Sequence, residues 1–361
     1  MAQLNPGVVT GENYRTLLQA CKKGKYALPA VNVTGTNSVN AVLEAAAANK
    51  SDVIIQCSNG GAAFFAGKGF PDSFQAKVLG AVAMARHVHV LAEHYGICVV
   101  LHTDHADKKL IPWLDALMDH NEAHSEQLGY PLFSSHMLDL SAEDIDFNLA
   151  ESKKMLERMA KMDMSLEIEL GVTGGEEDGV GSDNVDNDKL YTQPEDVLKA
   201  YETLNEIGHF SVAASFGNVH GVYKPGNVRL RPEILKNSQE LVQKTYGTEE
   251  NPLDLVFHGG SGSEKEKIEE SLNYGIFKMN IDTDTQFAFA EGVGKYVFEN
   301  ENAFKYQIDP ETGEPTKKKY DPRVWLRKGE EAIIARLNEA FTDLRSKGKS
   351  LALDDAEREA A

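Results

Sequence analysis

The sequence predicts an α/β fold: a (β/α)8 barrel with a C-terminal helical extension. Short apolar segments recur along the chain and alternate with segments of helical periodicity. Polar residues follow nearly every apolar segment, as expected where strand ends form the mouth of a barrel. Eight strands are predicted, at 28–33, 53–57, 97–102, 132–136, 166–170, 210–215, 253–258 and 275–280. A doubly wound open sheet is the alternative, weakened because no GxGxxG motif follows the first strand.

Helical periodicity fills the intervals between the predicted strands. Helices are expected at 11–24, 37–49, 73–95, 108–128, 142–162, 194–207, 232–246, 264–273 and 284–299. A long amphipathic helix is expected at 329–345, and the polar tail from Lys347 is expected to fray. We expect all 361 residues to form one domain, with the barrel at about 28–300 and the extension at about 301–361. Segments 171–191 and 216–230 are unusually long loops, and the first, rich in glycine and acid, is predicted to be a lid.

Composition excludes several classes of protein. Hydrophobic residues make up 42% and charged residues 26%, as in soluble globular proteins, and no apolar run approaches the ~20 residues of a membrane span. The N-terminus lacks a secretory signal, and three cysteines without CxxC spacing indicate reduced thiols and a cytoplasmic location. The net charge of −19 disfavours nucleic acid and membrane partners. An anionic substrate would therefore need local attraction from a metal, helix N-termini or placed basic residues.

The third predicted strand ends in an abrupt change of polarity. Residues 97–105 read Ile-Cys-Val-Val-Leu-His-Thr-Asp-His, so five apolar residues lead into the polar tip. Asp104 and His105 are neighbours and would point to opposite sides of an extended chain. Both can face one site only if the strand already bends into its loop. We interpret Asp104 as an acid/base candidate and His105 as a metal-ligand candidate; an N-cap aspartate beside a surface histidine explains this stretch equally well.

Histidines near other strand ends extend this interpretation. His220 follows the sixth strand and His258 ends the seventh; both precede glycine, which permits close approach of another group. Because strand carboxyl ends meet at one mouth, these residues and His105 can form a three-histidine zinc site. The alternative is three unrelated loop histidines. His120 and His124 have the i,i+4 spacing of a metal pair but lie in a charged segment, so a solvated face is preferred.

Carboxylates add a second candidate ion site. Glu167 and Glu169 alternate on the fifth strand and therefore face the same side of the sheet. Two carboxylates that point into a barrel need a cation or a shared proton. Asp139 follows the fourth strand and could join Glu169 on a second ion.

Glycine-rich strand ends predict phosphate binding. Segments 258–263 (His-Gly-Gly-Ser-Gly-Ser) and 280–285 (Asn-Ile-Asp-Thr-Asp-Thr) each lead from a strand into a predicted helix, whose N-terminal amides can bind an anion. These loops follow strands seven and eight, the usual phosphate position in barrels. Segment 56–61 (Gln-Cys-Ser-Asn-Gly-Gly) is a third polar strand end.

Together these motifs resemble class II, metal-dependent fructose-1,6-bisphosphate aldolases over residues ~10 to 345. The resemblance rests on 101–105, 133–139, 166–171, 173–179, 214–223, 257–263, 278–284 and 320–327. One local departure is present: many relatives have Cys-Ala-Lys-Lys after the Asp-His pair, whereas residues 106–109 here are Ala-Asp-Lys-Lys. This removes a thiol near the site but no expected ligand.

The resemblance implies roles for individual residues. His105, His220 and His258 would bind the catalytic Zn²⁺, and Asp139 with Glu169 would hold a second divalent metal. Asp104 would be the proton donor, and Glu177 the base that takes a proton from dihydroxyacetone phosphate. Substrate-binding residues would be Gln56, Ser58, Gly221, Gly259, Gly260, Ser261, Asn280, Ile281, Asp282, Thr283 and, from the partner subunit of a homodimer, Arg323. The family also implies a monovalent cation, K⁺ or Na⁺, near the phosphate.

The implied reaction is the reversible aldol cleavage of fructose 1,6-bisphosphate in glycolysis and gluconeogenesis. Zinc as Lewis acid would stabilise the enediolate, and a closed lid would exclude water. The alternatives are a tagatose 1,6-bisphosphate aldolase, Schiff-base chemistry at Lys278, a barrel metallohydrolase and a non-catalytic binding protein. The hydrolase would not need two phosphate sites, and the binding protein would not need acid, base and metal residues together.

Overall fold

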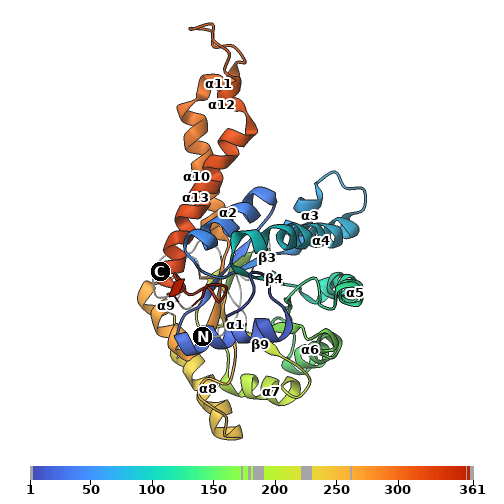
Figure 1. Cartoon of the computed structure of the whole chain (residues 1–361). Helices are drawn as coiled ribbons and strands as arrows, with labels where there is room; N and C mark the ends of the chain where they lie inside the picture. Colours follow the sequence, from blue (N-terminus) through green and yellow to red (C-terminus); the bar gives the residue numbers. More distant parts are fainter. Residues whose placement is uncertain are drawn as a thin grey trace.

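The computed structural model describes residues 3–171, 174–177, 180–181, 191–220, 230–260, 262–354 and 356–357; for 174–177, 180–181 and 219–220 it describes the backbone alone. Eight parallel strands form a closed barrel (Figure 1). They are β2 (Leu28–Asn32), β3 (Val53–Cys57), β4 (Cys98–Thr103), β5 (Ser135–Leu138), β6 (Ser165–Leu170), β9 (Phe210–Ala214), β11 (Leu255–Phe257) and β12 (Ile276–Ile281). Their order is β4-β3-β2-β12-β11-β9-β6-β5, and pairing of β4 with β5 closes the ring. The predicted (β/α)8 barrel is confirmed, and the open sheet is wrong.

Helices surround the barrel and bury their apolar faces against it. They are α1 (Gly11–Gly24), α2 (Thr36–Ala48), α3 (Asn59–Ala66), α4 (Ser73–Leu91), α5 (Ile111–Leu128), α6 (Ile145–Met159), α7 (Pro194–Leu204), α8 (Glu233–Tyr246) and α9 (Lys265–Ser271). Most strand residues are apolar because side chains on both faces are buried, against the helices outside and in the barrel interior inside. The exceptions include Glu167 and Glu169 on β6 and Lys278 on β12. The fourth barrel strand, β5, spans Ser135–Leu138 rather than the predicted 132–136, so it begins three residues later than predicted.

A helical arm projects from the barrel (Figure 1). It consists of α10 (Thr283–Glu299), α11 (Glu301–Lys305), α12 (Lys317–Tyr320) and α13 (Pro322–Asp343). The backbones of α10 and α13 approach closely because glycine lies at their contact: a Cβ on Gly292 would come within 2.4 Å of the Lys328 carbonyl oxygen. The long C-terminal helix α13 begins at Pro322, seven residues before its predicted start at 329.

The floor of the barrel is closed by both terminal segments. Strand β1 (Gly7–Val8) pairs with β4, and the Leu4 amide donates to the Leu351 carbonyl at 2.8 Å. The buried carboxylate of Asp52 accepts hydrogen bonds from the Ser350 hydroxyl and from the Leu351 and Cys98 amides. Burial raises the pKa of Asp52 to about 6, although these hydrogen bonds oppose the shift. The expectation that the tail frays from Lys347 is therefore wrong as far as Leu351, which is fully buried.

The second sheet involves the two long loops. Strand β7 (Gly174–Glu177) pairs with β10 (Val219–His220) in parallel and with β8 (Val180–Gly181) in antiparallel orientation. His220 pairs with Gly175, so the backbone that carries a predicted metal ligand runs beside the acidic segment. Residues 172–173, 178–179 and 182–190 of the predicted lid, and Gly221, lie outside the described residues.

Candidate active site

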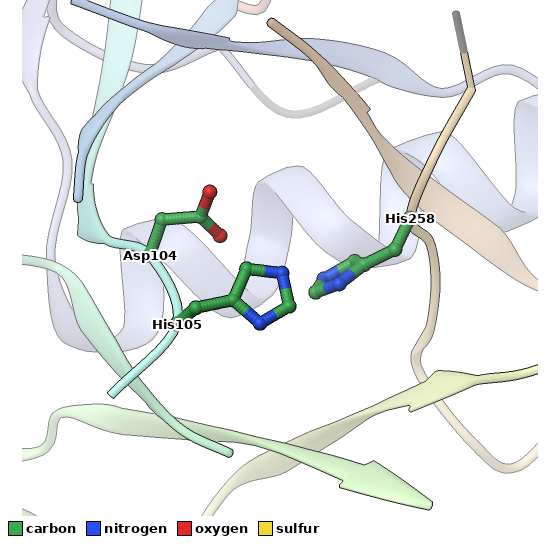
Figure 2. Close-up of side chains that lie close together, drawn as sticks. All are labelled: Asp104, His105 and His258. Carbon is green, nitrogen blue, oxygen red and sulfur yellow. The ribbon is translucent and has the colours of Figure 1, made fainter. Parts of the chain in front are cut away.

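Asp104 and His105 reach one site because β4 has already ended. The strand stops at Thr103, the Asp104 amide donates to the Cys57 carbonyl at 3.0 Å, and His105 has a φ of 24°. A positive φ is costly for a residue with a Cβ, so the surrounding structure enforces the bend. Figure 2 shows the carboxylate of Asp104 beside the ring of His105, which faces the ring of His258. The bend required by the sequence argument is present.

Asp104 is held by side-chain amides rather than by a helix. Asn32 Nδ2 donates to one carboxylate oxygen at 3.0 Å and Asn280 Nδ2 to the other at 3.2 Å. Gln56 Nε2 in turn donates to Asn32 Oδ1 at 2.7 Å, which their register on β2 and β3 permits. Because Asp104 caps no helix and is 1% exposed, the N-cap alternative is wrong. In this loop that role belongs to Asp107, which accepts from two following amides.

His105 and His258 meet from opposite sides of the barrel. Their ring centroids are 4.6 Å apart, and His105 Nδ1 lies 2.9 Å from Asp139 and 3.6 Å from Glu169. His258 Nδ1 lies 3.5 Å from the same Glu169 oxygen. These distances bring residues from the third, fourth, fifth and seventh predicted strands into one site.

The donor set fits a divalent metal. Among the described residues, two overlapping groups have ligand atoms within 4.8 Å of one another: Asp104, His105 and His258, and His105, Asp139 and Glu169. Imidazole nitrogens and carboxylate oxygens in a buried position are the ligands that zinc takes in proteins. His220, the third predicted histidine, contributes only its backbone to the described structure. Asp104 belongs to the first group, so its position allows it either to bind the metal or to transfer a proton.

Charges within the site shift the ionisation of its members. Burial raises the pKa of Asp139, but the hydrogen bond and charge of His105 outweigh it and hold that pKa at about 2. Burial lowers the pKa of His258, but hydrogen bonds with Glu167 and Glu169 prevail and raise it to about 9. A cation bound at His258 would displace a proton, so its binding is expected to weaken at low pH.

The buried Glu167 has its own cation. Its Oε2 lies 2.7 Å from Lys278 Nζ and its Oε1 lies 2.8 Å from His258 Nε2. The sequence predicts that carboxylates pointing into the barrel need a cation or a shared proton. For Glu167 that cation is the ammonium group of Lys278. From the sequence alone, Lys278 is a candidate only for imine chemistry, and its pairing with Glu167 is found only in the structure.

The predicted phosphate loops lie after β11 and β12. Gly259 has a φ of 60°, and a Cβ on Gly260 would come within 2.5 Å of the Met279 side chain. Asp282 precedes α10, which begins at Thr283, and accepts from Gln286; Ile281 is fully buried. Both positions in the loop after β11 therefore favour glycine, while Ser261 lies outside the described residues.

Two other predicted substrate residues have structural partners. Ser58 Oγ accepts from the Gly61 amide at 3.1 Å and caps α3, a helix the sequence argument did not predict. Arg323 lies at the arm end of α13, is 90% exposed and pairs with Asp321 at 2.7 Å. Its position on the arm separates it from the barrel mouth in the described chain.

Other histidines have structural partners. His136 is buried between Thr103 and Asn121, at 2.7 and 2.8 Å. His124 contacts the Tyr130 carbonyl, and neither it nor His120 belongs to a metal-capable group among the described residues. Sequence reasoning missed Asn32, whose only signal was its place at the end of the first strand.

Comparisons with known proteins give the family. The family described as "Fructose-bisphosphate aldolase class-II" matches residues 12–349. The chain is 55% identical to the class 2 fructose-bisphosphate aldolase of Escherichia coli K12 over 348 residues, covering 95% of this chain and 97% of that protein. A Campylobacter jejuni fructose-bisphosphate aldolase is 54% identical over 348 residues, with 95% and 98% coverage.

A solved structure agrees with this result. The crystal structure of a fructose-bisphosphate aldolase from C. jejuni superposes with a TM-score of 0.88 at 52% identity, covering 97% of this chain and 100% of that one. The match to the family covers the whole barrel and the whole arm. The chain therefore belongs to the class II fructose-bisphosphate aldolase family.

Proposed function

We propose that the chain catalyses the reversible cleavage of D-fructose 1,6-bisphosphate to dihydroxyacetone phosphate and D-glyceraldehyde 3-phosphate. The observation that carries the proposal is the meeting of Asp104, His105 and His258 at the barrel mouth, in a chain 55% identical to a class 2 aldolase. The family implies a divalent metal, and we propose zinc, held by His105, His220 and His258. When bound, zinc supplies a Lewis acid for the substrate's carbonyl and hydroxyl oxygens.

Asp104 is proposed to move a proton at the oxygen of the departing aldehyde. Two amide donors fix its carboxylate, and a buried acid within reach of the reacting group can accelerate proton transfer by about 10² to 10⁴. Glu177, on β7, is proposed as the base at dihydroxyacetone phosphate. The pairing of β7 with β10 supports this role because it brings the backbones of the acidic segment and the His220 segment together.

A second divalent ion and a monovalent cation, K⁺ or Na⁺, are proposed at the same mouth. Asp139 and Glu169 would hold the divalent ion, supported by their shared contact with His105. Gly221, Gly259, Gly260, Ser261 and residues 280–283 would bind the phosphate of dihydroxyacetone phosphate, with Gln56 and Ser58 near the sugar. The helix α10 N-terminus at Thr283 supports an anion there.

The partner subunit of a homodimer is proposed to supply Arg323 to the second phosphate. Support comes from the arm, where large apolar side chains of α10 such as Phe298 (82% exposed) and Phe287 face solvent. Exposed apolar groups gathered on a projecting element mark association surfaces. Arg323 lies on that same arm and is paired only to its neighbour Asp321 among the described contacts.

A coupled cleavage assay tests the function. Fructose and tagatose 1,6-bisphosphates are offered to the purified chain with and without chelator, and zinc is then restored. We expect fructose bisphosphate to be cleaved faster, activity to vanish with chelator, and zinc to recover it. Faster tagatose bisphosphate cleavage would favour the alternative substrate. Chelator-resistant cleavage with borohydride trapping at Lys278 would refute the metal mechanism, and release of inorganic phosphate instead of triose phosphates would indicate a hydrolase.

A further inference from the structure

Glu167 is a buried carboxylate with no part in the reaction proposed above. It lies on β6 two residues before Glu169, and both side chains point into the barrel and are 2% exposed. Glu169 contacts the metal-capable residues directly. An ionised carboxylate at this depth is costly unless charges and hydrogen bonds surround it, so its partners indicate why it is there.

Each oxygen of Glu167 is fixed by a different residue. Oε1 lies 2.8 Å from Nε2 of His258, and Oε2 lies 2.7 Å from Nζ of Lys278. His102 Nε2 lies 3.5 Å from Oε2. Glu167, His258 and Lys278 come from β6, from the end of β11 and from β12, and none exceeds 2% exposure. The carboxylate therefore bridges a histidine and a lysine inside the barrel.

The contact with Glu167 sets the orientation and tautomer of His258. A carboxylate only accepts hydrogen bonds, so Nε2 of the imidazole is the donor. The other ring nitrogen, Nδ1, then lies on the side of Glu169, at 3.5 Å, and of the His105 ring. Ligating histidines in proteins commonly use a carboxylate on the second nitrogen in this way, which fixes the ring and strengthens the ligand.

Lys278 makes the carboxylate tolerable in this position. The ammonium neutralises Glu167 and anchors the oxygen that faces away from His258. Removal of one member of a buried ion pair leaves an uncompensated charge, whereas removal of both members often has little net effect. This role explains a fully buried lysine on β12 without an imine.

We propose that Glu167 and Lys278 are positioning residues for the metal: Glu167 holds His258 so that Nδ1 faces the ion, and Lys278 acts only through Glu167. The inference rests on the proposed metal site at His258. It predicts tight coupling between the two residues, because Lys278 makes no direct contact with His105, His258 or Asp104 among the described interactions.

Metal affinity measured in four variants tests the proposal. Glu167→Gln, Lys278→Met and the double variant are compared with His136→Gln, a matched control that removes a buried histidine of β5 outside the site. The zinc dissociation constant is obtained by competition with a chromogenic chelator. The visible spectrum of the cobalt-loaded protein reports the ligand field, and circular dichroism confirms folding.

We expect Glu167→Gln to raise the zinc dissociation constant by about 10- to 100-fold and to alter the cobalt spectrum. Lys278→Met should weaken binding at least as much, while the double variant should be no worse than the weaker-binding single variant. His136→Gln should bind zinc like the wild type. If Lys278→Met does not fold, Glu167→Gln and the double variant still test the proposal. The double variant lacks both members of the ion pair and therefore retains no unpaired charge.

Wild-type affinity in folded Glu167→Gln would overturn the inference and leave the proposed function intact. A double variant whose loss equals the product of the single losses would overturn the claim that Lys278 acts through Glu167. Absence of metal binding by the wild-type chain would instead refute the proposed metal site, and this inference with it.

Discussion

Replacement of Asp104 by asparagine separates its two possible roles. The carboxylate accepts one amide hydrogen bond on each oxygen, from Asn32 at 3.0 Å and from Asn280 at 3.2 Å. Asparagine has nearly the same shape but must present its own NH₂ to one of these donors. With 1% exposure no water replaces the lost acceptor, so we expect a cost of about 1–3 kcal/mol in unfolding free energy, reduced by the removal of a buried charge.

The effect on catalysis should be larger than the effect on stability. Loss of a general acid lowers the rate by about 10² to 10⁴, or roughly 3–5 kcal/mol of transition-state stabilisation. We therefore expect Asp104→Asn to reduce kcat for fructose bisphosphate cleavage by at least about 100-fold while zinc content stays at the wild-type level.

Steady-state cleavage and metal analysis on the same preparation check this prediction. A kcat within tenfold of the wild type would show that Asp104 carries no essential proton. Loss of zinc together with activity would show instead that Asp104 is a ligand, as its place in the first metal-capable group permits.

Four further predictions address other residues. His105→Ala should lose bound zinc, measured by metal analysis of the dialysed protein; normal zinc content would contradict its role as ligand. Glu177→Ala should keep zinc but lose most turnover in the cleavage assay, and wild-type turnover would exclude it as the base. Arg323→Ala should raise KM about tenfold with zinc unchanged, since a charge-assisted hydrogen bond contributes ~1.5–3 kcal/mol; an unaltered KM would argue against a phosphate contact. The pKa of Asp52 is raised to about 6, so the folded state binds the proton of Asp52 more tightly than the unfolded state does. The contribution of Asp52 to the free energy of unfolding therefore falls as the pH rises from ~4 to ~6, by about 3 kcal/mol in total. Asp52→Asn should not show this loss of stability. If the free energy of unfolding changes with pH in the same way in both proteins between pH 4.5 and 7.5, the reasoning is refuted.

The barrel and the meeting of His105 with His258 could be predicted because both follow from topology. Apolar segments alternating with helices imply parallel strands, and parallel strands bring their carboxyl ends together whatever the distance along the chain. A local pattern therefore located residues that lie on opposite sides of the ring. The same logic placed Glu167 and Glu169 on one face of β6, where the structure has them.

Other features depend on partners that no local pattern reveals. Helix α3 contains Gly60 and Gly61, which disfavour a helix, and it forms because it packs on α4, where Gly80 lies against the Ala62 carbonyl. Lys278 gave no sign of its pairing with Glu167, 111 positions away. The polar tail was expected to fray because its acceptor, Asp52, lies nearly 300 residues earlier in the sequence.

The attachment of Ser350 and Leu351 to Asp52 has a consequence for synthesis of the chain. Asp52 precedes β3, whereas its hydroxyl donor is translated 298 positions later. A nascent polypeptide on the ribosome can assemble every strand of the ring before this carboxylate obtains that donor. We therefore expect late intermediates to be open at the base and susceptible to proteases there, until residues 350 and 351 emerge.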